Sequence, residues 1–357
     1  MKLCVLFGGR SGEHEVSLRS AASEIGNLDR ARYEIVAIGI DKAGVWHLQD
    51  RVRTVTLPDQ GESVEIVPSA TAVAVVPGQG LRVGSGLLEV DCVFPVLHGT
   101  FGEDGTVQGL LDVAGLPYVG AGVLGSSVAM DKETAKRLWR DAGLPVVEFR
   151  TVDRKTSETA IREAARAIGY PLCVKPCASG SSLGVTRVSA EEHLAAATAE
   201  ALRYDTRALL ERWVQGREIE CSVIGNATPR AFPPGEILTS GAHSFYDYDA
   251  KYVDPEGARL ATRADLEPQT QERVMRVAEK AYAQIRCQGM ARVDFFVESR
   301  SGEVFLNEIN TIPGFTSISM FPRMCAASGL PYGRLLDTLI DLALERHAER
   351  QTVQYRK

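Results

Sequence analysis

The first forty residues alternate between strand and helix patterns, and this alternation limits the fold more than any other feature of the sequence. Apolar runs at residues 3–7 and 34–40 predict two buried strands, and the pattern over residues 16–27 predicts a helix between them. Two strands joined by a crossover helix lie parallel in one sheet. A further buried strand is predicted at residues 90–97. The chain therefore opens as an α/β fold with a parallel sheet.

The remaining sequence predicts additional domains. With 357 residues, the chain is too long for one compact core. Short β-like runs at residues 45–90, divided by Gly and Pro, predict hairpins at the edge of the first domain. We predict an N-terminal α/β domain over residues 1–130, a smaller α+β domain over residues 131–215 and a third domain over residues 216–350.

The composition excludes several classes of protein. Hydrophobic residues make up 45% and charged residues 24%, as in a globular protein. The net charge of −6 argues against binding to nucleic acid or to an anionic membrane. The seven cysteines form no C-x-x-C pair and lie mostly in apolar runs, which indicates reduced thiols in a cytoplasmic protein. The N-terminal apolar stretch is too short for a signal peptide, and no apolar window approaches transmembrane length.

A predicted hairpin at residues 290–310 is the most informative stretch for chemistry. With its turn in the Ser-Arg-Ser-Gly segment, Asp294 faces Glu308 and Arg292 faces Asn310. Alternate strand residues share a face, so these side chains converge on one patch. Oxygen donors of this kind suit Mg²⁺ or Mn²⁺. An Arg–Asp cross-strand pair beside an exposed carboxylate explains the pattern equally well from the residues alone.

A Gly/Ser-rich loop is a candidate anion site. A predicted strand at residues 172–175 ends at Lys175, and residues 176–184 then offer backbone N–H groups and hydroxyls. The chain has no Walker A loop, and its N-terminal glycines lack the G-x-G-x-x-G spacing, which weakens a dehydrogenase interpretation. A plain Gly/Ser turn stays an alternative.

Three further segments carry weaker signals. Residues 211–214 could present backbone groups to an adenine, with Glu218 left for a ribose, although an ordinary linking strand is preferred on local grounds. Lys132 starts a predicted helix and is either a phosphate ligand or a solvated surface residue. Glu15 opens the first helix, where a carboxylate is common because it suits the helix dipole.

The order of the motifs is more specific than any one of them. They are HEVS and LHGTFGEDG, MDK, VKP with GSSLG, ERWV with GRE, FYDYDAKY, and ARVDFF with LNEINTIPGFTSISMFP. In this order they resemble the motifs of the D-alanine–D-alanine ligases, members of the ATP-grasp superfamily, over about residues 3–347. The decorated 45–90 region looks like that of the longer A-type bacterial ligases. The resemblance implies a three-domain ATP-grasp fold with an N-terminal, parallel-sheet pre-ATP-grasp domain.

The resemblance also implies an ATP site between the second and third domains. The residues that it assigns to ATP are Lys132, Lys175, Ser182, Glu211, Trp213, Val214, Glu218, Lys251 and Phe296. Lys251 is expected to reach the γ-phosphate from a long polar loop. Two Mg²⁺ or Mn²⁺ ions are expected at Asp294, Glu308 and Asn310, with Glu308 bridging them.

The implied reaction joins two D-alanine molecules through a D-alanyl phosphate, for the synthesis of peptidoglycan precursors. The residues assigned to D-alanine or to the chemistry are Glu15, His98, Ser181, Tyr252, Arg292, Gly314, Ser319 and Met320. Glu15 is expected to hold the first ammonium and to join Ser181 and Tyr252 in a hydrogen-bonded chain. Arg292 and the Gly314 N–H are expected to stabilise the oxyanion.

Two related activities stay open as alternatives. A D-alanine–D-lactate or D-alanine–D-serine ligase of the same superfamily would share the motifs, although FYDYDAKY looks like the dipeptide form. Similar proteins commonly form a homodimer through the N-terminal domain, and the same assembly is expected here.

Overall fold

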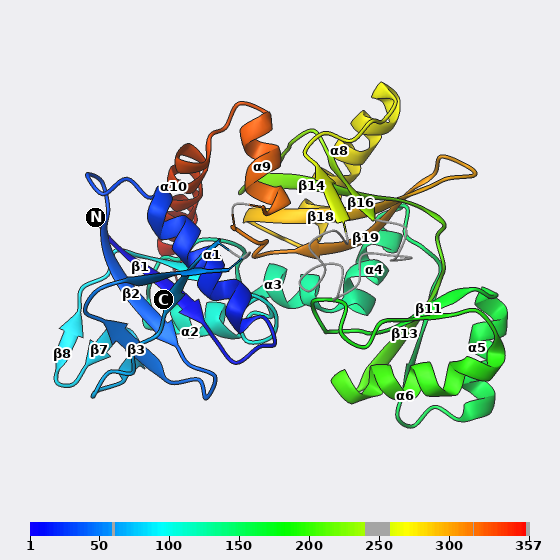
Figure 1. Ribbon diagram of the computed structural model, residues 1–357, viewed down its shortest axis with the longest axis horizontal. Coiled ribbons are helices and arrows are strands. Elements are labelled where there is room, and N and C mark those ends of the chain that lie inside the picture. The colour runs from blue at the N-terminus through cyan, green and yellow to red at the C-terminus, as the bar shows by residue number, and fades with distance from the viewer. Residues whose placement is uncertain (59–60, 240–257, 317, 355–357) are drawn as a thin grey trace.

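The computed structural model describes residues 1–58, 61–239, 258–316 and 318–354, in which helices flank several β-sheets (Figure 1). The helices are α1 (His14–Asn27), α2 (Thr106–Ala114), α3 (Val123–Met130), α4 (Lys132–Asp141), α5 (Glu158–Ile168), α6 (Leu194–Tyr204), α8 (Pro268–Gln284), α9 (Met320–Ala327) and α10 (Tyr332–Gln351), with a 3₁₀ turn at Glu191–His193. The strands are β1 (Lys2–Gly8), β2 (Glu34–Ile40), β3 (Trp46–Gln49), β4 (Arg53–Leu57), β5 (Gly61–Glu65), β6 (Val73–Val76), β7 (Gly80–Val83), β8 (Gly86–Leu88), β9 (Cys92–Val96), β10 (Phe149–Asp153), β11 (Leu172–Pro176), β12 (Thr186–Val188), β13 (Arg207–Arg212), β14 (Gly216–Gly225), β15 (Arg230–Ala231), β16 (Gly235–Thr239), β17 (Ala258–Ala261), β18 (Gly289–Glu298) and β19 (Val304–Asn310).

The first sheet has the strand order β3-β2-β1-β9. Strand β1 pairs in parallel with both β2 and β9, and α1 connects β1 to β2. The predicted parallel α/β opening is therefore confirmed. Strand β3 adds antiparallel to β2, and the antiparallel strands β4–β5 and β6–β7–β8 follow. The prediction of hairpins between residues 45 and 90 is confirmed as well.

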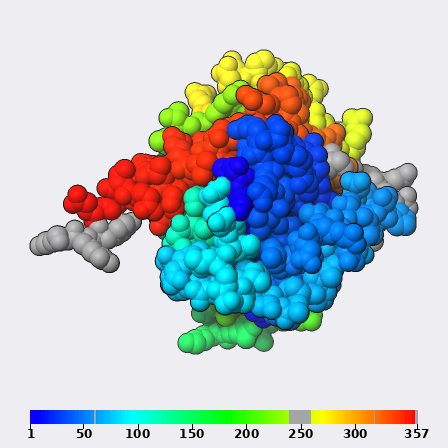
Figure 2. Space-filling view, turned by 90° about the vertical axis from the view of Figure 1, so that its left-hand side faces the viewer, coloured from blue at the N-terminus to red at the C-terminus, as the bar shows by residue number. Residues whose placement is uncertain are grey.

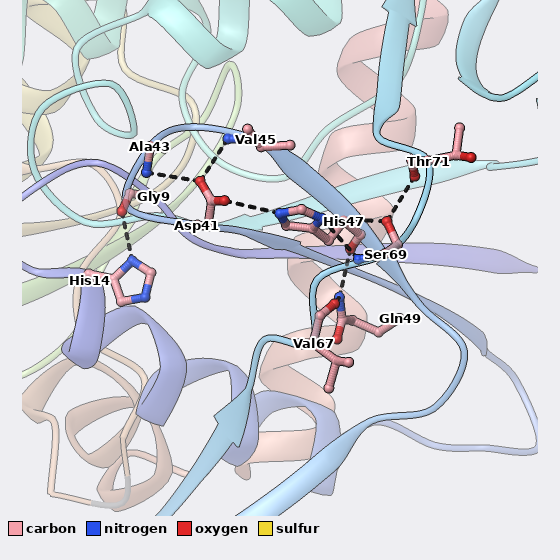
Figure 3. Close-up of polar contacts among 10 residues, drawn as sticks. All are labelled: Gly9, His14, Asp41, Ala43, Val45, His47, Gln49, Val67, Ser69 and Thr71. Carbon is pink, nitrogen blue, oxygen red and sulfur yellow. Dashed lines mark hydrogen bonds and ion pairs between the residues drawn. The ribbon is translucent and has the colours of Figure 1, made fainter.

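A polar network fixes the outer edge of this sheet (Figure 3). His47 accepts the N–H of Ser69 through Nδ1 at 3.1 Å, so Nε2 carries the ring proton and donates to Asp41 at 3.0 Å. The hydrogen bond from His47 holds the pKa of Asp41 below its ordinary value. Gln49 donates to the carbonyl of Val67 at 3.0 Å and accepts its N–H at 2.8 Å. These contacts hold the connection after β5 against β3.

The other two main sheets are antiparallel. The second sheet has the order β10-β13-β11-β12, with α5 and α6 packed around a core that lies between Val152 and Leu210 in the sequence. The third sheet has the order β17-β16-β14-β18-β19, with β15 beside β14. Helix α8 covers one face of the third sheet. The opposite face carries the polar residues of the cleft described below.

The hydrophobic cores cross the predicted domain boundaries. One core joins β1, α1 and β9 to α9 and α10, with Phe94 and Leu336 among its fully buried residues. Figure 2 shows the C-terminal helix, in red, beside the N-terminal elements, in blue. A second core joins Trp139 of α4 to α8 and the third sheet. The division after residues 130 and 215 stays a proposal, and the packing unit around the first sheet includes the last helix.

Arg346 ties α10 to the segment that follows β9. It is 4% exposed, its guanidinium donates to the carbonyls of Tyr118 at 2.7 Å and of Gly120, and it lies 4.4 Å from the centroid of the Tyr118 ring. Since Arg346→Ala leaves buried carbonyls without these donors, we expect it to lower the free energy of unfolding by about 2–4 kcal/mol. Urea unfolding measures the loss, with Arg350→Ala as control because that side chain is 47% exposed. Equal losses in the two variants would contradict this role of Arg346.

Helices α2, α3 and α9 were not predicted from the sequence. The signal for α2 was present, because Val107, Leu111 and Ala114 recur at helical spacing and are buried. Gly105 precedes the helix with φ 93°, a conformation that favours glycine. Among the helices that the structure describes, none is long and apolar enough to cross a membrane.

Candidate active site

A cleft of about 750 Å³ opens between the β11–β12 loop, the polar face of the third sheet and the loop after β9. Most of the site residues predicted from the sequence line it: His98, Lys132, Lys175, Ser181, Ser182, Glu211, Trp213, Val214, Glu218, Arg292, Asp294, Phe296, Glu308, Asn310, Gly314, Ser319 and Met320. Lys251 and Tyr252 lie outside the described residues. The structure therefore brings together side chains from all parts of the chain.

The predicted register of the hairpin is confirmed. Strands β18 and β19 pair so that Asp294 faces Glu308 and Arg292 faces Asn310. A β-bulge next to this pair inserts Asn307 as an extra residue, which the sequence analysis did not foresee. Asn307 also lines the cleft. The bulge thus adds the Asn307 amide to the polar face. With strict alternation, Asn307 would lie on the opposite face of the strand from Glu308.

Opposite charges surround the carboxylates of this face. Arg292 pairs with Asp294 in a bidentate manner, with Nε–Oδ1 and Nη2–Oδ2 distances of 2.7 Å. Asn310 donates to Asp294 Oδ2 at 2.9 Å, and Lys132 Nζ lies 3.4 Å from Glu308 Oε2. Burial opposes the charge of Arg292, but the carboxylates around it raise its pKa well above the ordinary value. The guanidinium is therefore a fixed positive charge in the cleft.

The donors fit a hard divalent cation. Over the described ranges, no three His, Cys, Asp or Glu side chains gather into a metal cluster, and the predicted set of Asp294, Glu308 and Asn310 contains only two such residues besides its amide. Mg²⁺ and Mn²⁺ suit such a small set, because substrate phosphates and waters complete their coordination. The chemistry of these oxygen donors fits such an ion, and the metal site stays a prediction.

Lys132 connects the hairpin to the Gly/Ser loop. Its Nζ donates to the carbonyl of Ser179 at 2.6 Å while it lies near Glu308. In the same loop Ser181 and Ser182 have φ values of 50° and 56°. L-residues adopt this left-handed backbone at a cost of about 1–3 kcal/mol each, and such strain is concentrated at functional sites. The surrounding contacts hold this loop in a conformation that faces the cleft.

Lys175 lies near the end of β11, below the same loop. Its Nζ pairs with Glu211 Oε2 at 2.7 Å and donates to Asn307 Oδ1 at 3.2 Å. Glu211 is 3% exposed, and although burial raises its pKa, neighbouring lysines lower it below the ordinary value. The carboxylate is thus ionised and engaged by lysine. The predicted contact of Glu211 with adenine would therefore be made by its backbone.

The predicted adenine and ribose residues form another wall. Glu218 of β14 pairs with Phe296 of β18, so the two side chains share a face. Trp213 and Val214 lie between β13 and β14, and the guanidinium of Arg187 lies 4.9 Å from the centroid of the Trp213 ring. This arrangement offers a planar base both aromatic surface and backbone groups.

The loop from β19 to α9 forms a further wall of the cleft. A Cβ atom at Gly314 would lie 2.7 Å from Ser319 Oγ, so a side chain at this position would displace the Ser319 hydroxyl. Ser319 Oγ accepts the N–H of Thr316 at 3.0 Å and hydrogen bonds its hydroxyl at 2.8 Å. Helix α9 begins at Met320, and the N–H groups at a helix N-terminus favour anions. The loop can therefore receive a carboxylate.

Glu15 does not lie in the cleft, which corrects its predicted position. It pairs with Lys42 at 2.5 Å, its side chain is 62% exposed, and this hydrogen bond lowers its pKa. Because α1 begins at His14, Glu15 projects from the outer side of the first turn. Glu13 lines the cleft instead, and a Cβ atom at Gly180 would lie 3.0 Å from its Oε2. The carboxylate two residues earlier takes the position that the sequence analysis gave to Glu15.

His98 and Glu103, in the loop after β9, hydrogen bond to the loop after β19. His98 Nδ1 donates to the carbonyl of Ile312 at 2.9 Å and Nε2 accepts from Ser20 at 3.0 Å, while burial lowers its pKa. Glu103 accepts the N–H groups of Gly99 at 2.7 Å and of Ile312 at 2.9 Å. Burial raises the pKa of Glu103 to about 8. These contacts fix the loop that carries Gly314.

Several cleft residues were missed by the sequence analysis: Glu13, Arg19, Glu103, Glu220 and Asn307. The alternation of strand residues could have found Glu220, because it lies two positions after Glu218 and faces Asp294. Asn307 depends on a bulge, for which the sequence carried no signal.

The fold and the site together define a class of protein. One antiparallel sheet presents oxygen donors, a second presents a lysine beneath a Gly/Ser loop, and the cleft between them is that of the ATP-grasp ligases. The family model described as D-ala D-ala ligase N-terminus matches residues 2–121, and D-ala D-ala ligase C-terminus matches residues 138–341. The chain belongs to the D-alanine–D-alanine ligase family.

Individual relatives agree over nearly the whole chain. A D-alanine–D-alanine ligase A of Bradyrhizobium diazoefficiens is 45% identical over 99% of this chain and 98% of its own length. A D-alanine–D-alanine ligase of Shouchella clausii is 46% identical over 96% of this chain and 94% of its own. The solved D-alanine–D-alanine ligase from Coxiella burnetii has a TM-score of 0.83 at 38% identity, covering 98% and 96% of the two chains. The VanG D-Ala:D-Ser ligase from Enterococcus faecalis has a TM-score of 0.83 at 34% identity, covering 96% and 99%.

Proposed function

We propose that the protein joins two D-alanine molecules into D-alanyl-D-alanine, with conversion of ATP to ADP and phosphate, for peptidoglycan synthesis. The observation that carries the proposal is the cleft, which gathers metal-type oxygen donors, phosphate-type lysines and a helix N-terminus within one space. Relatives named for this activity at about 45% identity over nearly their full length support it.

The nucleotide occupies the space between the second and third sheets. Lys132, Lys175 and Ser182 bind its phosphates. Lys251, which is not among the described residues, binds the γ-phosphate. Asp294, Glu308 and Asn310, which share one face of the hairpin, would hold two Mg²⁺ or Mn²⁺ ions. Such ions, when bound, withdraw charge from the phosphoryl group and so favour its transfer. The protein's own contribution is to orient the phosphates and exclude water.

In the first step the carboxylate of one D-alanine attacks the γ-phosphorus, and the bond to the ADP oxygen breaks. The product is an acyl phosphate, whose carbonyl is far more electrophilic than that of a carboxylate. Glu13, in place of Glu15, holds the ammonium of this substrate, since Glu13 lines the cleft beside Gly180. Ser181 follows directly in the loop, and the predicted chain to Tyr252 is kept with Glu13 as its acidic member.

In the second step the amine of the other D-alanine attacks the acyl carbon, and phosphate leaves after the amine has lost a proton. The tetrahedral intermediate carries an oxyanion that Arg292 and the Gly314 N–H stabilise. The carboxylate of this substrate is bound by Ser319 and the Met320 N–H, at the N-terminus of α9. In this proposal the β18–β19 hairpin and the loop before α9 therefore both contact the second substrate.

Phosphate release tests the choice of second substrate. The amine of D-alanine, once it has lost its proton, is a stronger nucleophile than the hydroxyl of D-lactate. We therefore expect D-alanine alone to give faster release at pH 7.5 than D-alanine with D-lactate, and L-alanine to be inactive. D-serine carries the same amine nucleophile, so its arm tests how the second site accepts a different side chain. Faster release with D-lactate or D-serine would replace the dipeptide assignment, and the VanG relative makes the D-serine arm informative.

We further propose a cytoplasmic homodimer. The seven cysteines are free thiols, which suits a reducing compartment. Helices α2 and α3 expose apolar side chains: Leu110, Val113, Val123 and Leu124. Burial of such groups against a second copy is favourable. Light scattering should give twice the mass of one chain, and Leu124→Asp should give a monomer; a monomeric native protein would contradict the proposal.

A further inference from the structure

Lys136 of α4 is a charged residue that has no role in the mechanism proposed above. Its side chain is fully buried. Its Nζ pairs with Glu211 Oε1 at 2.6 Å and lies 3.5 Å from the carbonyl oxygen of Leu306. Burial lowers the pKa of this lysine and so disfavours an ammonium group, while the Glu211 carboxylate acts in the opposite direction.

Lys136 belongs to a triad with Glu211 and Lys175. The two carboxylate oxygens of Glu211 are shared, with Lys136 at 2.6 Å from Oε1 and Lys175 at 2.7 Å from Oε2. The three residues come from α4, β13 and β11, so helix and sheet packing bring them together. Two positive charges and one negative charge leave the triad with one net positive charge.

The triad is asymmetric with respect to the cleft. Lys175 and Glu211 line it, whereas Lys136 lies behind them without exposed surface. If Lys136 were neutral, the carboxylate of Glu211 would cancel the charge of Lys175, and a pair without net charge would face the phosphates. Charge interactions between buried side chains such as these are much stronger than on an exposed surface.

We propose that Lys136 is a positioning residue that sets the charge of the phosphate site: it neutralises Glu211 from behind, so that the ammonium of Lys175 acts on the nucleotide's phosphates. The ligand concerned is the anionic part of a nucleoside di- or triphosphate, and the inference rests on the proposed function of the cleft. A purely structural ion pair would tie α4 to β13 without affecting phosphate binding specifically.

Lys136→Met tests this role with little damage to the fold. Methionine is apolar and similar in length, and Glu211 keeps its pair with Lys175, so no buried charge is left alone. Calorimetric titration of the full chain with ADP and with adenosine separates phosphate from base. We expect ADP to bind at least about tenfold more weakly and adenosine to bind within about twofold of the native protein.

A second variant makes the test independent of simple disruption. Lys136→Met combined with Glu211→Gln removes one positive and one negative charge, so the net charge of the site returns to that of the native triad. The ratio of ADP affinity to adenosine affinity should recover to within about threefold of the native ratio. Lys155→Met, in an exposed turn, is the matched control for loss of one positive charge and should leave the ratio unchanged.

The titrations distinguish failure of the proposed role of Lys136 from failure of the nucleotide site. Unchanged ADP binding in Lys136→Met, equal weakening of ADP and adenosine, or no recovery in the double variant would overturn the proposed role of Lys136. If the native protein bound ADP no better than adenosine, the proposed nucleotide site itself would fail. The two failures are therefore distinguishable.

Discussion

Replacing Glu308 with glutamine should reduce turnover to about one-thousandth of the native rate or less, while the protein stays folded. Glu308 faces Asp294 across the hairpin and lies 3.4 Å from the ammonium of Lys132. The amide keeps the size of the side chain but removes the charge that would hold a divalent cation against the phosphates. Steady-state phosphate release at saturating Mg²⁺, ATP and D-alanine measures the effect.

Glu303→Gln is the matched control for this variant. Glu303 lies in the same hairpin but is exposed near its turn, away from the cleft. Its activity should stay within about twofold of the native value, because surface substitutions away from special features have small effects. Near-native turnover of Glu308→Gln at ordinary Mg²⁺ concentration would defeat the metal assignment.

The second large effect separates two neighbouring carboxylates. Glu13→Gln should raise the requirement for the first D-alanine by roughly 30- to several-thousand-fold, since removing one partner of a buried charge pair costs about 2–5 kcal/mol. Glu15→Gln should change it less than about fivefold, because Glu15 is 62% exposed and an exposed pair contributes about 1 kcal/mol or less. The KM for D-alanine at the first site, with the KM for ATP as reference, measures both variants.

The opposite order of effects would restore Glu15 as the ammonium ligand and remove Glu13 from it. Comparable increases in both variants would mean that neither side chain acts alone. An increase in the KM for ATP as large as that for D-alanine would point to a general disturbance of the cleft instead of a lost substrate contact.

The hairpin shows what the sequence could predict. Strand residues alternate with a period of two, and the position of a tight turn fixes which residues face each other, so the pairs at Asp294 and Arg292 followed from counting. The bulge at Asn307 did not follow, because one extra residue leaves no mark on composition or alternation. Local rules therefore predicted the donor set but not the amide beside it.

The turn after β1 shows what local sequence patterns could not predict. Glu13 and Glu15 are both acidic residues at the start of one helix, and the sequence alone does not say which faces inward. The answer depends on where the helix begins, and α1 begins at His14, whose Nδ1 donates to the carbonyl of Gly9 at 2.7 Å (Figure 3). Likewise, the pair between Lys136 and Glu211 joins residues distant in sequence, which only tertiary packing brings together.

The core shared by the first sheet and α10 has a consequence for how the chain is made. Leu335, Leu336 and Leu339 of α10 complete the packing of β1 and β9, so the earliest part of the chain lacks part of its core until the last helix has left the ribosome. The second sheet, whose core lies between Val152 and Leu210, has its own packing partners much sooner. During synthesis the middle of this protein can therefore fold before its beginning does.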